Sequence, residues 1–95
     1  MKDIPRFLAG FKNFQRTYFC DDSTFFANLG RRQSPKVLVV ACSDSRVDPA
    51  ILTGCEPGDM FVVRNVANLV PPYEKTPGNH GVSAAVEYAV RILAV

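Results

Sequence analysis

The sequence predicts an α/β fold in which N-terminal helices are followed by a β-α-β-α pattern with a parallel sheet. Residues 37–41, Val-Leu-Val-Val-Ala, form a continuous apolar run rather than an alternating one. Such a run is typical of a strand buried on both faces of a parallel sheet. Residues 60–64, Met-Phe-Val-Val-Arg, predict a second strand, and a helical turn between the two supplies the crossover that parallel strands need.

Two helices are predicted before the first strand. Asp3 is the expected N-cap of a helix over residues 4–19, with Pro5 tolerated in its first turn. The segment Asp21-Asp22-Ser23 is expected to cap a shorter helix that runs through Leu29 and ends at Gly30. The longer helix places one row of side chains on a single face: Ile4, Phe7, Leu8, Phe11, Gln15 and Tyr18.

The second half of the sequence predicts a short helical turn and a long apolar helix. Asp48-Pro49 opens the turn, which runs through Leu52 and closes at Gly54. After a Pro- and Gly-rich connector, residues 82–93 are apolar on most faces, with a narrow polar stripe at Ser83, Glu87 and Arg91. A helix this apolar is expected to be mostly buried. Because two short strands cannot cover it, we expect a further strand after Val95.

Composition excludes several classes of protein. The 95 residues carry 11 basic and 9 acidic side chains, a net charge of +2, which is too balanced for a nucleic-acid or membrane-surface protein. The N-terminus has no apolar signal-peptide core, and no apolar run approaches the length of a membrane span. Three widely spaced cysteines, Cys20, Cys42 and Cys55, do not form a disulfide framework and favour a reducing compartment. We therefore expect a cytoplasmic protein.

The segment from Cys42 to Arg46 is the strongest functional signal. Cys42 is predicted to be the first residue past a buried strand, at the edge where open α/β sheets bind ligands. Asp44 and Arg46 lie two apart, so in an extended segment they can face the same way and form a bidentate carboxylate–guanidinium pair. A lone cysteine in this place is more often a buried small hydrophobe, but a soft ligand beside an ion pair points to a functional site.

The motifs around this segment closely resemble the β class of carbonic anhydrases. Cys42-Ser43-Asp44-Ser45-Arg46 matches the Cys-x-Asp-x-Arg signature of that family, and Arg64-Asn65-Val66-Ala67-Asn68 matches its Arg-Asn-x-Ala-Asn segment. The resemblance extends back through residues 33–36 and forward through residues 80–90, which covers nearly all of the chain beyond the first helices. It implies the N-terminal portion of a β-carbonic anhydrase fold.

The resemblance also implies roles for individual residues. Cys42 would be a thiolate ligand of a catalytic Zn²⁺, and Asp44 and Arg46 would be the catalytic dyad beside it. Asp44 would either accept a hydrogen bond from zinc-bound water or, when the dyad opens, swing onto the metal as a ligand. The implied reaction is the reversible hydration of carbon dioxide to bicarbonate. The implied substrate-binding residues are Gln33, an amide donor, and three that line an apolar pocket: Phe61, Val66 and Tyr88.

Simpler structural roles are open for several of these residues. Phe61, on a buried strand, and Tyr88, on a buried helix, are expected to be core residues first, and Gln33 could cap a loop. Arg64 and Asn65 are expected to brace the end of the second strand. The single histidine, His80, is expected to be a loop or interface residue.

The family's His-x-x-Cys pair, which completes the zinc site, has no counterpart in residues 1–95. Neither Cys20 nor Cys55 replaces it by motif, so we expect one incomplete domain over residues 1–95, with a helical arm over residues 1–30, that is inactive alone. The alternatives are a shortened, non-catalytic relative that acts as an oligomerising or anion-binding module, and an unrelated thiol protein that uses Cys42 for redox chemistry. The resemblance also implies a homodimer or a dimer of dimers.

Overall fold

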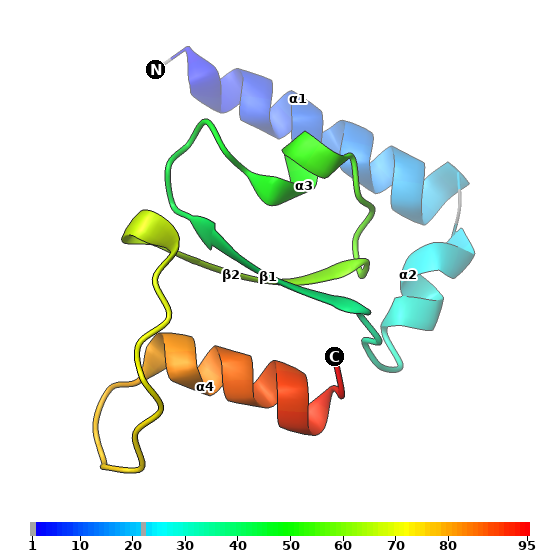
Figure 1. Ribbon diagram of the computed structural model, residues 1–95. Coiled ribbons are helices and arrows are strands. Elements are labelled where there is room, and N and C mark those ends of the chain that lie inside the picture. The colour runs from blue at the N-terminus through cyan, green and yellow to red at the C-terminus, as the bar shows by residue number, and fades with distance from the viewer. Residues whose placement is uncertain (1, 22) are drawn as a thin grey trace. The chain divides into compact units, whose positions relative to one another are not determined.

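The computed structural model describes residues 2–21 and 23–95, which divide between Gln33 and Ser34 into two units (Figure 1). The first unit contains α1 (Asp3–Gln15), a π-helical continuation η1 (Arg16–Asp21) and α2 (Ser23–Leu29). The second contains β1 (Val37–Cys42), α3 (Pro49–Thr53), β2 (Met60–Asn65), the short 3₁₀ turn η2 (Val66–Asn68), α4 (Gly81–Glu87) and its π-helical continuation η3 (Tyr88–Ile92). This order confirms the predicted helices followed by β-α-β-α. None of the helices among the described residues has the length and apolar character needed to cross a membrane.

The N-terminal helix begins and ends differently from the prediction. Lys2, not Asp3, is its N-cap, and Asp3 lies in the first turn, where its carboxylate accepts a hydrogen bond from Arg6 at 3.2 Å. A carboxylate in that turn also meets the positive end of the helix dipole, which explains why Asp3 lies inside the helix. The regular helix stops at Gln15 instead of residue 19, and wider π-helical turns follow. The predicted caps of α2 include Asp22, which lies outside the described residues.

An aromatic cluster holds α1, η1 and α2 together. Phe14 lies 5.6 Å from Phe26 between ring centroids, and Phe19 stacks on Phe26 at 4.9 Å. Each such pair contributes about 0.5–1.5 kcal/mol beyond the area it buries, so these contacts stabilise the helical hairpin. The predicted apolar row at the start of α1 is exposed to solvent at Ile4, Phe7, Leu8 and Phe11, although one of these residues, Phe11, stacks on Phe14 at 6.3 Å.

The two strands of the second unit pair in parallel, as predicted. Val37 is opposite Met60, and the register continues to Cys42 opposite Asn65. Cys42 is therefore the last residue of β1 rather than the first residue beyond it, since its pairing with Asn65 extends the ladder by one step. In Figure 1, α3 and α4 lie on opposite sides of the two strands.

The burial predicted for β1 and for the last helix is not found. Val63 and Ala89 are the buried hydrophobic residues among those described, and the β1 residues are half-buried or exposed. Ile92, near the end of the last helix, is 67% exposed. The prediction was wrong because a two-stranded sheet with a short helix on each side offers too little apolar surface to cover every face.

Candidate functional site

Strand alternation divides the side chains at the end of the sheet between its two faces. Successive side chains on a strand point to opposite faces, so Cys42 and Asn65, as register partners, share a face with Phe61. The ring of Phe61 lies 6.0 Å from the ring of Tyr88, so this is the face that α4 and η3 approach. Arg64 lies on the opposite face.

The Cys42 sulfur lies among backbone N–H groups. The N–H of Asp44 donates to its Sγ at 3.5 Å. This hydrogen bond and a second one from the N–H of Ala67 lower the pKa of the half-buried Cys42 thiol, because both stabilise the thiolate. Partial burial and the Asp44 carboxylate oppose the shift, and the net direction is still downward. The strand end therefore favours the charged form of the sulfur, which is the form that binds metals.

Asp44 and Arg46 form the predicted bidentate pair. The Nε of Arg46 lies 3.0 Å from Asp44 Oδ1, and a terminal nitrogen lies 2.6 Å from Oδ2. These side-chain bonds from Arg46 are the largest cause of the lowered pKa of Asp44, and the bond from the Arg46 backbone N–H lowers it further. In return, Asp44 raises the pKa of Arg46. Arg46 is 85% exposed, so solvent screens the pair and it contributes little to stability. Its effect is to hold the carboxylate ionised and in one orientation.

The chain around this pair is a turn, not the extended segment that the sequence predicted. The backbone N–H of Arg46 donates to Asp44 Oδ1 at 2.8 Å, and the N–H of Val47 donates to the Asp44 carbonyl at 3.2 Å. An aspartate that bonds the backbone two residues on closes an Asx turn, and this local bond overrides the extended conformation. The three donations from Arg46 fill both acceptor positions of Oδ1 and one of Oδ2. One acceptor position on Oδ2 is left among the hydrogen bonds described.

Arg64 ties this turn to the sheet. Its Nε donates to the Cys42 carbonyl at 2.9 Å, and one terminal nitrogen donates to the Asp44 carbonyl at 2.8 Å. The other terminal nitrogen lies 3.4 Å from the carboxylate of Asp48, the residue that caps α3 by accepting from the N–H of Ala50. Arg64 thus braces β1, the turn and α3 at once, which confirms the structural role predicted for it.

Asn65 bridges the loop that follows β2. Its Oδ1 accepts a hydrogen bond from the N–H of Leu69 at 2.8 Å, and its Nδ2 donates to the carbonyl of Leu69 at 3.0 Å. Between them, Ala67 and Asn68 have positive φ values of 69° and 47°. The bracing role predicted for Asn65 is confirmed. The left-handed backbone at Ala67 was not anticipated, although an asparagine at each end of residues 65–68 was a usable sign of a tight turn.

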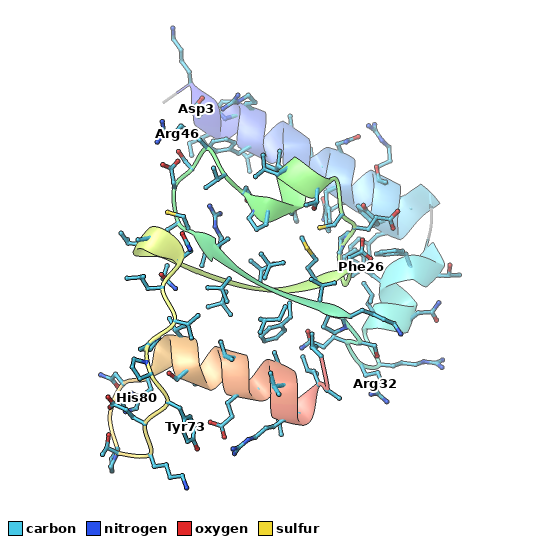
Figure 2. The ribbon with its side chains drawn as sticks, viewed as in Figure 1. Asp3, Phe26, Arg32, Arg46, Tyr73 and His80 are labelled. Carbon is cyan, nitrogen blue, oxygen red and sulfur yellow. The ribbon has the colours of Figure 1, made fainter. Side chains whose placement is uncertain are left out.

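The predicted substrate-binding residues are only partly brought together. Phe61 and Tyr88 are in contact, and Val66 follows β2 directly with 82% of its surface exposed. Gln33 is exposed and belongs to the other unit. His80 lies on the connector before α4, away from the Arg46 turn, as Figure 2 shows, and its Nε2 is 2.9 Å from the Thr76 carbonyl. This agrees with the loop position predicted for His80.

The donor set at the strand end has the chemistry of a zinc half-site. Cys42 offers a thiolate and Asp44 a carboxylate, both established ligand types for Zn²⁺. A protein zinc site has at least three protein ligands, and no group of three or more His, Cys, Asp or Glu side chains gathers within the described part of the chain. The remaining thiols, Cys20 and Cys55, are free. The residues present thus fit zinc in type, and the described part of the chain gathers fewer donors than a zinc site needs.

Comparison with known proteins gives a uniform result. A family profile described as carbonic anhydrase matches residues 37–95. The chain is 53% identical over 95 residues to a carbonic anhydrase of Pseudomonas aeruginosa, and 49% identical over 90 residues to the chloroplastic β-carbonic anhydrase 5 of Arabidopsis thaliana. These matches cover 100% and 95% of the chain. The chain spans 41% of the first relative and 28% of the second.

Solved structures agree with these relatives. The β-carbonic anhydrase CcaA superimposes with a TM-score of 0.83 at 40% identity, over 100% of this chain and 42% of that one. A tetrameric β-carbonic anhydrase of Sordaria macrospora gives a TM-score of 0.81 at 33% identity, over 100% of this chain and 46% of that one. At these identities, the likeness extends to sequence as well as fold.

Proposed function

Since the chain belongs to the β-class carbonic anhydrase family, we propose that it forms part of a zinc-dependent enzyme for the reversible hydration of carbon dioxide to bicarbonate. The observation that carries this proposal is the Cys42 thiol at the end of β1, next to an aspartate held by Arg46. Residues 1–95 alone are inactive in this proposal, because they supply too few zinc ligands.

Cys42 and Asp44 have separate tasks in the proposed site. Cys42 binds the metal as a thiolate, which its lowered pKa favours. When bound, zinc acts as a Lewis acid that makes water acidic enough to be a nucleophile at neutral pH. Asp44 uses its remaining acceptor position on Oδ2 to orient that water, and Arg46 keeps the carboxylate in place.

The substrate is small and apolar, and the face of the sheet that carries Cys42 suits it. Phe61 and Tyr88 present stacked aromatic rings there, and we assign Val66, which follows β2 directly, to the same apolar lining. Gln33 donates an amide hydrogen bond to an oxygen of the substrate or of the bicarbonate product. Aromatic and aliphatic walls exclude competing water from a reacting carbon dioxide molecule.

The decisive test measures zinc content and carbon dioxide hydration. It uses residues 1–95, and the chain extended through whatever coding sequence follows Val95. We expect zinc binding and activity in the extended chain, loss of both in Cys42→Ser, and retention of both in the matched control Cys55→Ser. A zinc-loaded, extended Cys42→Ser protein with full activity would exclude Cys42 as a ligand. An extended chain without zinc would favour the non-catalytic alternative.

The assembly belongs to the same proposal. The exposed apolar row on α1, defined by Ile4, Phe7, Leu8 and Phe11, supports a homodimer or a dimer of dimers, and a relative from Sordaria macrospora is described as tetrameric. Light scattering coupled to size-exclusion chromatography tests this. A monomer across the micromolar range, for a protein that has bound its zinc, would contradict it.

A cytoplasmic location is also proposed. The three cysteines are all free in the structure, which suits a reducing compartment. One relative is chloroplastic, so the test is cell fractionation of the tagged native protein, with a cytosolic and an organellar marker as controls. Recovery with the organellar marker would contradict the proposal.

A further inference from the structure

The bridge from Asn65 to Leu69 closes a five-residue loop at the carboxyl end of β2. Both polar atoms of the Asn65 side chain are used, one as acceptor at 2.8 Å and one as donor at 3.0 Å, and both bonds go to the backbone of Leu69. A side chain that bonds to both the N–H and the carbonyl of one residue fixes the orientation of that residue as well as its distance from the side chain. The backbone carbonyl of Asn65 is held too, by the N–H of Ser43 at 2.8 Å.

The loop inside this bridge has a backbone that alanine rarely adopts. Ala67 has φ 69° and ψ 18°, a left-handed conformation in which its Cβ crowds the backbone. Asn68 is left-handed as well, with φ 47°, but asparagine tolerates this region. Ala67 thus needs an external restraint, and the Asn65 bridge around it is one.

The unusual conformation has a consequence at the sulfur of Cys42. The turn that contains Ala67 contacts β1, and the Ala67 backbone N–H bonds to Cys42 closely enough to lower the pKa of its thiol, alongside the N–H of Asp44 at 3.5 Å from Sγ. Hydrogen bonds to a ligating sulfur draw charge from it and so tune the metal that it binds. Asn65 itself is not a donor to the sulfur, so its influence must pass through the loop.

We propose that Asn65 is a positioning residue, which holds Ala67 in a left-handed conformation so that the Ala67 N–H is directed at the Cys42 sulfur. The bridge from Asn65 to Leu69 needs no metal. Its consequence for the metal rests on the function proposed above. Asn65 would thereby set how much charge the Cys42 thiolate gives to a bound zinc, although its own side chain bonds to Leu69.

Amide hydrogen exchange tests the bridge. Loss of two hydrogen bonds in Asn65→Ala is expected to speed exchange at Ala67 and Leu69 by about tenfold or more. The amide of Val63, which is buried in β2, reports global stability, so the change at Ala67 and Leu69 is expected to exceed the change at Val63. Asn79→Ala, an exposed asparagine in another loop, is the matched control and leaves all three rates unchanged. Unchanged exchange at Ala67 and Leu69 in Asn65→Ala would overturn the proposal.

A second measurement tests the link to the sulfur. In the wild-type background, Cys42→Ala is expected to move the Ala67 amide proton upfield, because the hydrogen bond to sulfur is lost, whereas Cys55→Ala leaves it in place. In the Asn65→Ala background, Cys42→Ala is expected to cause little or no shift. A shift of equal size in both backgrounds, or none in either, would overturn the proposal. If Asn65→Ala fails to fold, Asn65→Asp takes its place, since the carboxylate keeps the acceptor for Leu69 and loses the donor.

The effect of Asn65 on zinc binding is tested by a third, separate measurement. Exchange rates and amide shifts need no metal, so their failure counts against the bridge alone. Zinc affinity, measured by competition with a chromophoric chelator on the extended chain, is expected to change at least severalfold in Asn65→Ala and to be unchanged in Asn79→Ala. An extended wild-type chain that binds no zinc would contradict the proposed function and leave the role of Asn65 at the sulfur standing.

Discussion

The guanidinium of Arg46 returns to the carboxylate of Asp44, only two residues earlier, with 3.0 Å between Nε and Oδ1 and 2.6 Å between a terminal nitrogen and Oδ2. The same Oδ1 also accepts the backbone N–H of Arg46 at 2.8 Å. One residue thus contributes three donors to a single carboxylate. Arg46 is largely exposed, so the value of the pair lies in the orientation and charge of Asp44 rather than in stability.

Replacing Arg46 is expected to raise the pKa of Asp44. Because the Arg46 side chain is the largest cause of the lowered pKa, Arg46→Gln moves that pKa up toward the ordinary value of an aspartate. Carbonyl-detected NMR titration of Asp44 measures the change, and Arg31→Gln is the control. An unchanged pKa would show that the backbone bond alone holds the carboxylate ionised.

The direction of that shift also predicts a dependence of stability on pH. A carboxyl whose pKa is lower in the folded chain contributes stability above its unfolded pKa, and this contribution disappears as the pH falls through the folded value. The difference in unfolding free energy between the wild-type chain and Asp44→Asn is therefore expected to shrink on acidification below the ordinary aspartate pKa. Urea unfolding at a series of pH values measures it. A constant difference would contradict the assignment.

Arg64 is expected to matter more for stability than any exposed arginine of the chain. Arg64→Met removes the donors for the Cys42 and Asp44 carbonyls and leaves Asp48 without its cation, a loss of about 1–3 kcal/mol. Arg31→Met, at an exposed position, is expected to stay within about 0.5 kcal/mol of wild type. Urea midpoints at constant m-value give both numbers. Equal effects would mean that the bracing contacts carry no net free energy.

Ala67→Gly is expected to stabilise the fold. Glycine adopts the positive φ of this position without the crowding of a Cβ, which favours the folded chain by up to about 1 kcal/mol. The same substitution at Ala84, within α4, is expected to cost about 1 kcal/mol, because there glycine only adds flexibility. Opposite signs in thermal or urea unfolding confirm the left-handed backbone, and two destabilising results would contradict it.

Cys42 is expected to react as a thiolate at lower pH than an ordinary cysteine. The N–H groups of Asp44 and Ala67 lower its pKa, so the pH profile of its alkylation by iodoacetamide is shifted downward. Mass spectrometry of peptides resolves Cys42 from Cys20 and Cys55 in the same sample, so that each chain carries its own controls. A profile centred at or above the ordinary cysteine pKa would contradict the hydrogen bonds to sulfur.

The local elements of the fold could be read from the sequence with small errors at their ends. Apolar runs predicted β1 and β2, and the segment Asp48-Pro49 predicted the start of α3, since these patterns depend on neighbouring residues only. The same locality explains why the motif from Cys42 to Arg46 identified both the ion pair and the family. Burial was predicted less well, because it depends on which elements pack against each surface rather than on neighbouring residues.

What the sequence by itself determined is the order of the elements, the Asp44–Arg46 pair and membership of the β-class family. What only the tertiary structure decided is how the end of β2 supports the end of β1. The bonds from Arg64 to the backbone of Cys42 and Asp44 join residues about twenty positions apart, and they exist only once the register places Cys42 opposite Asn65. Hydrogen bonds of that range depend on strand pairing rather than on the preference of any one residue, so no local pattern could reveal them.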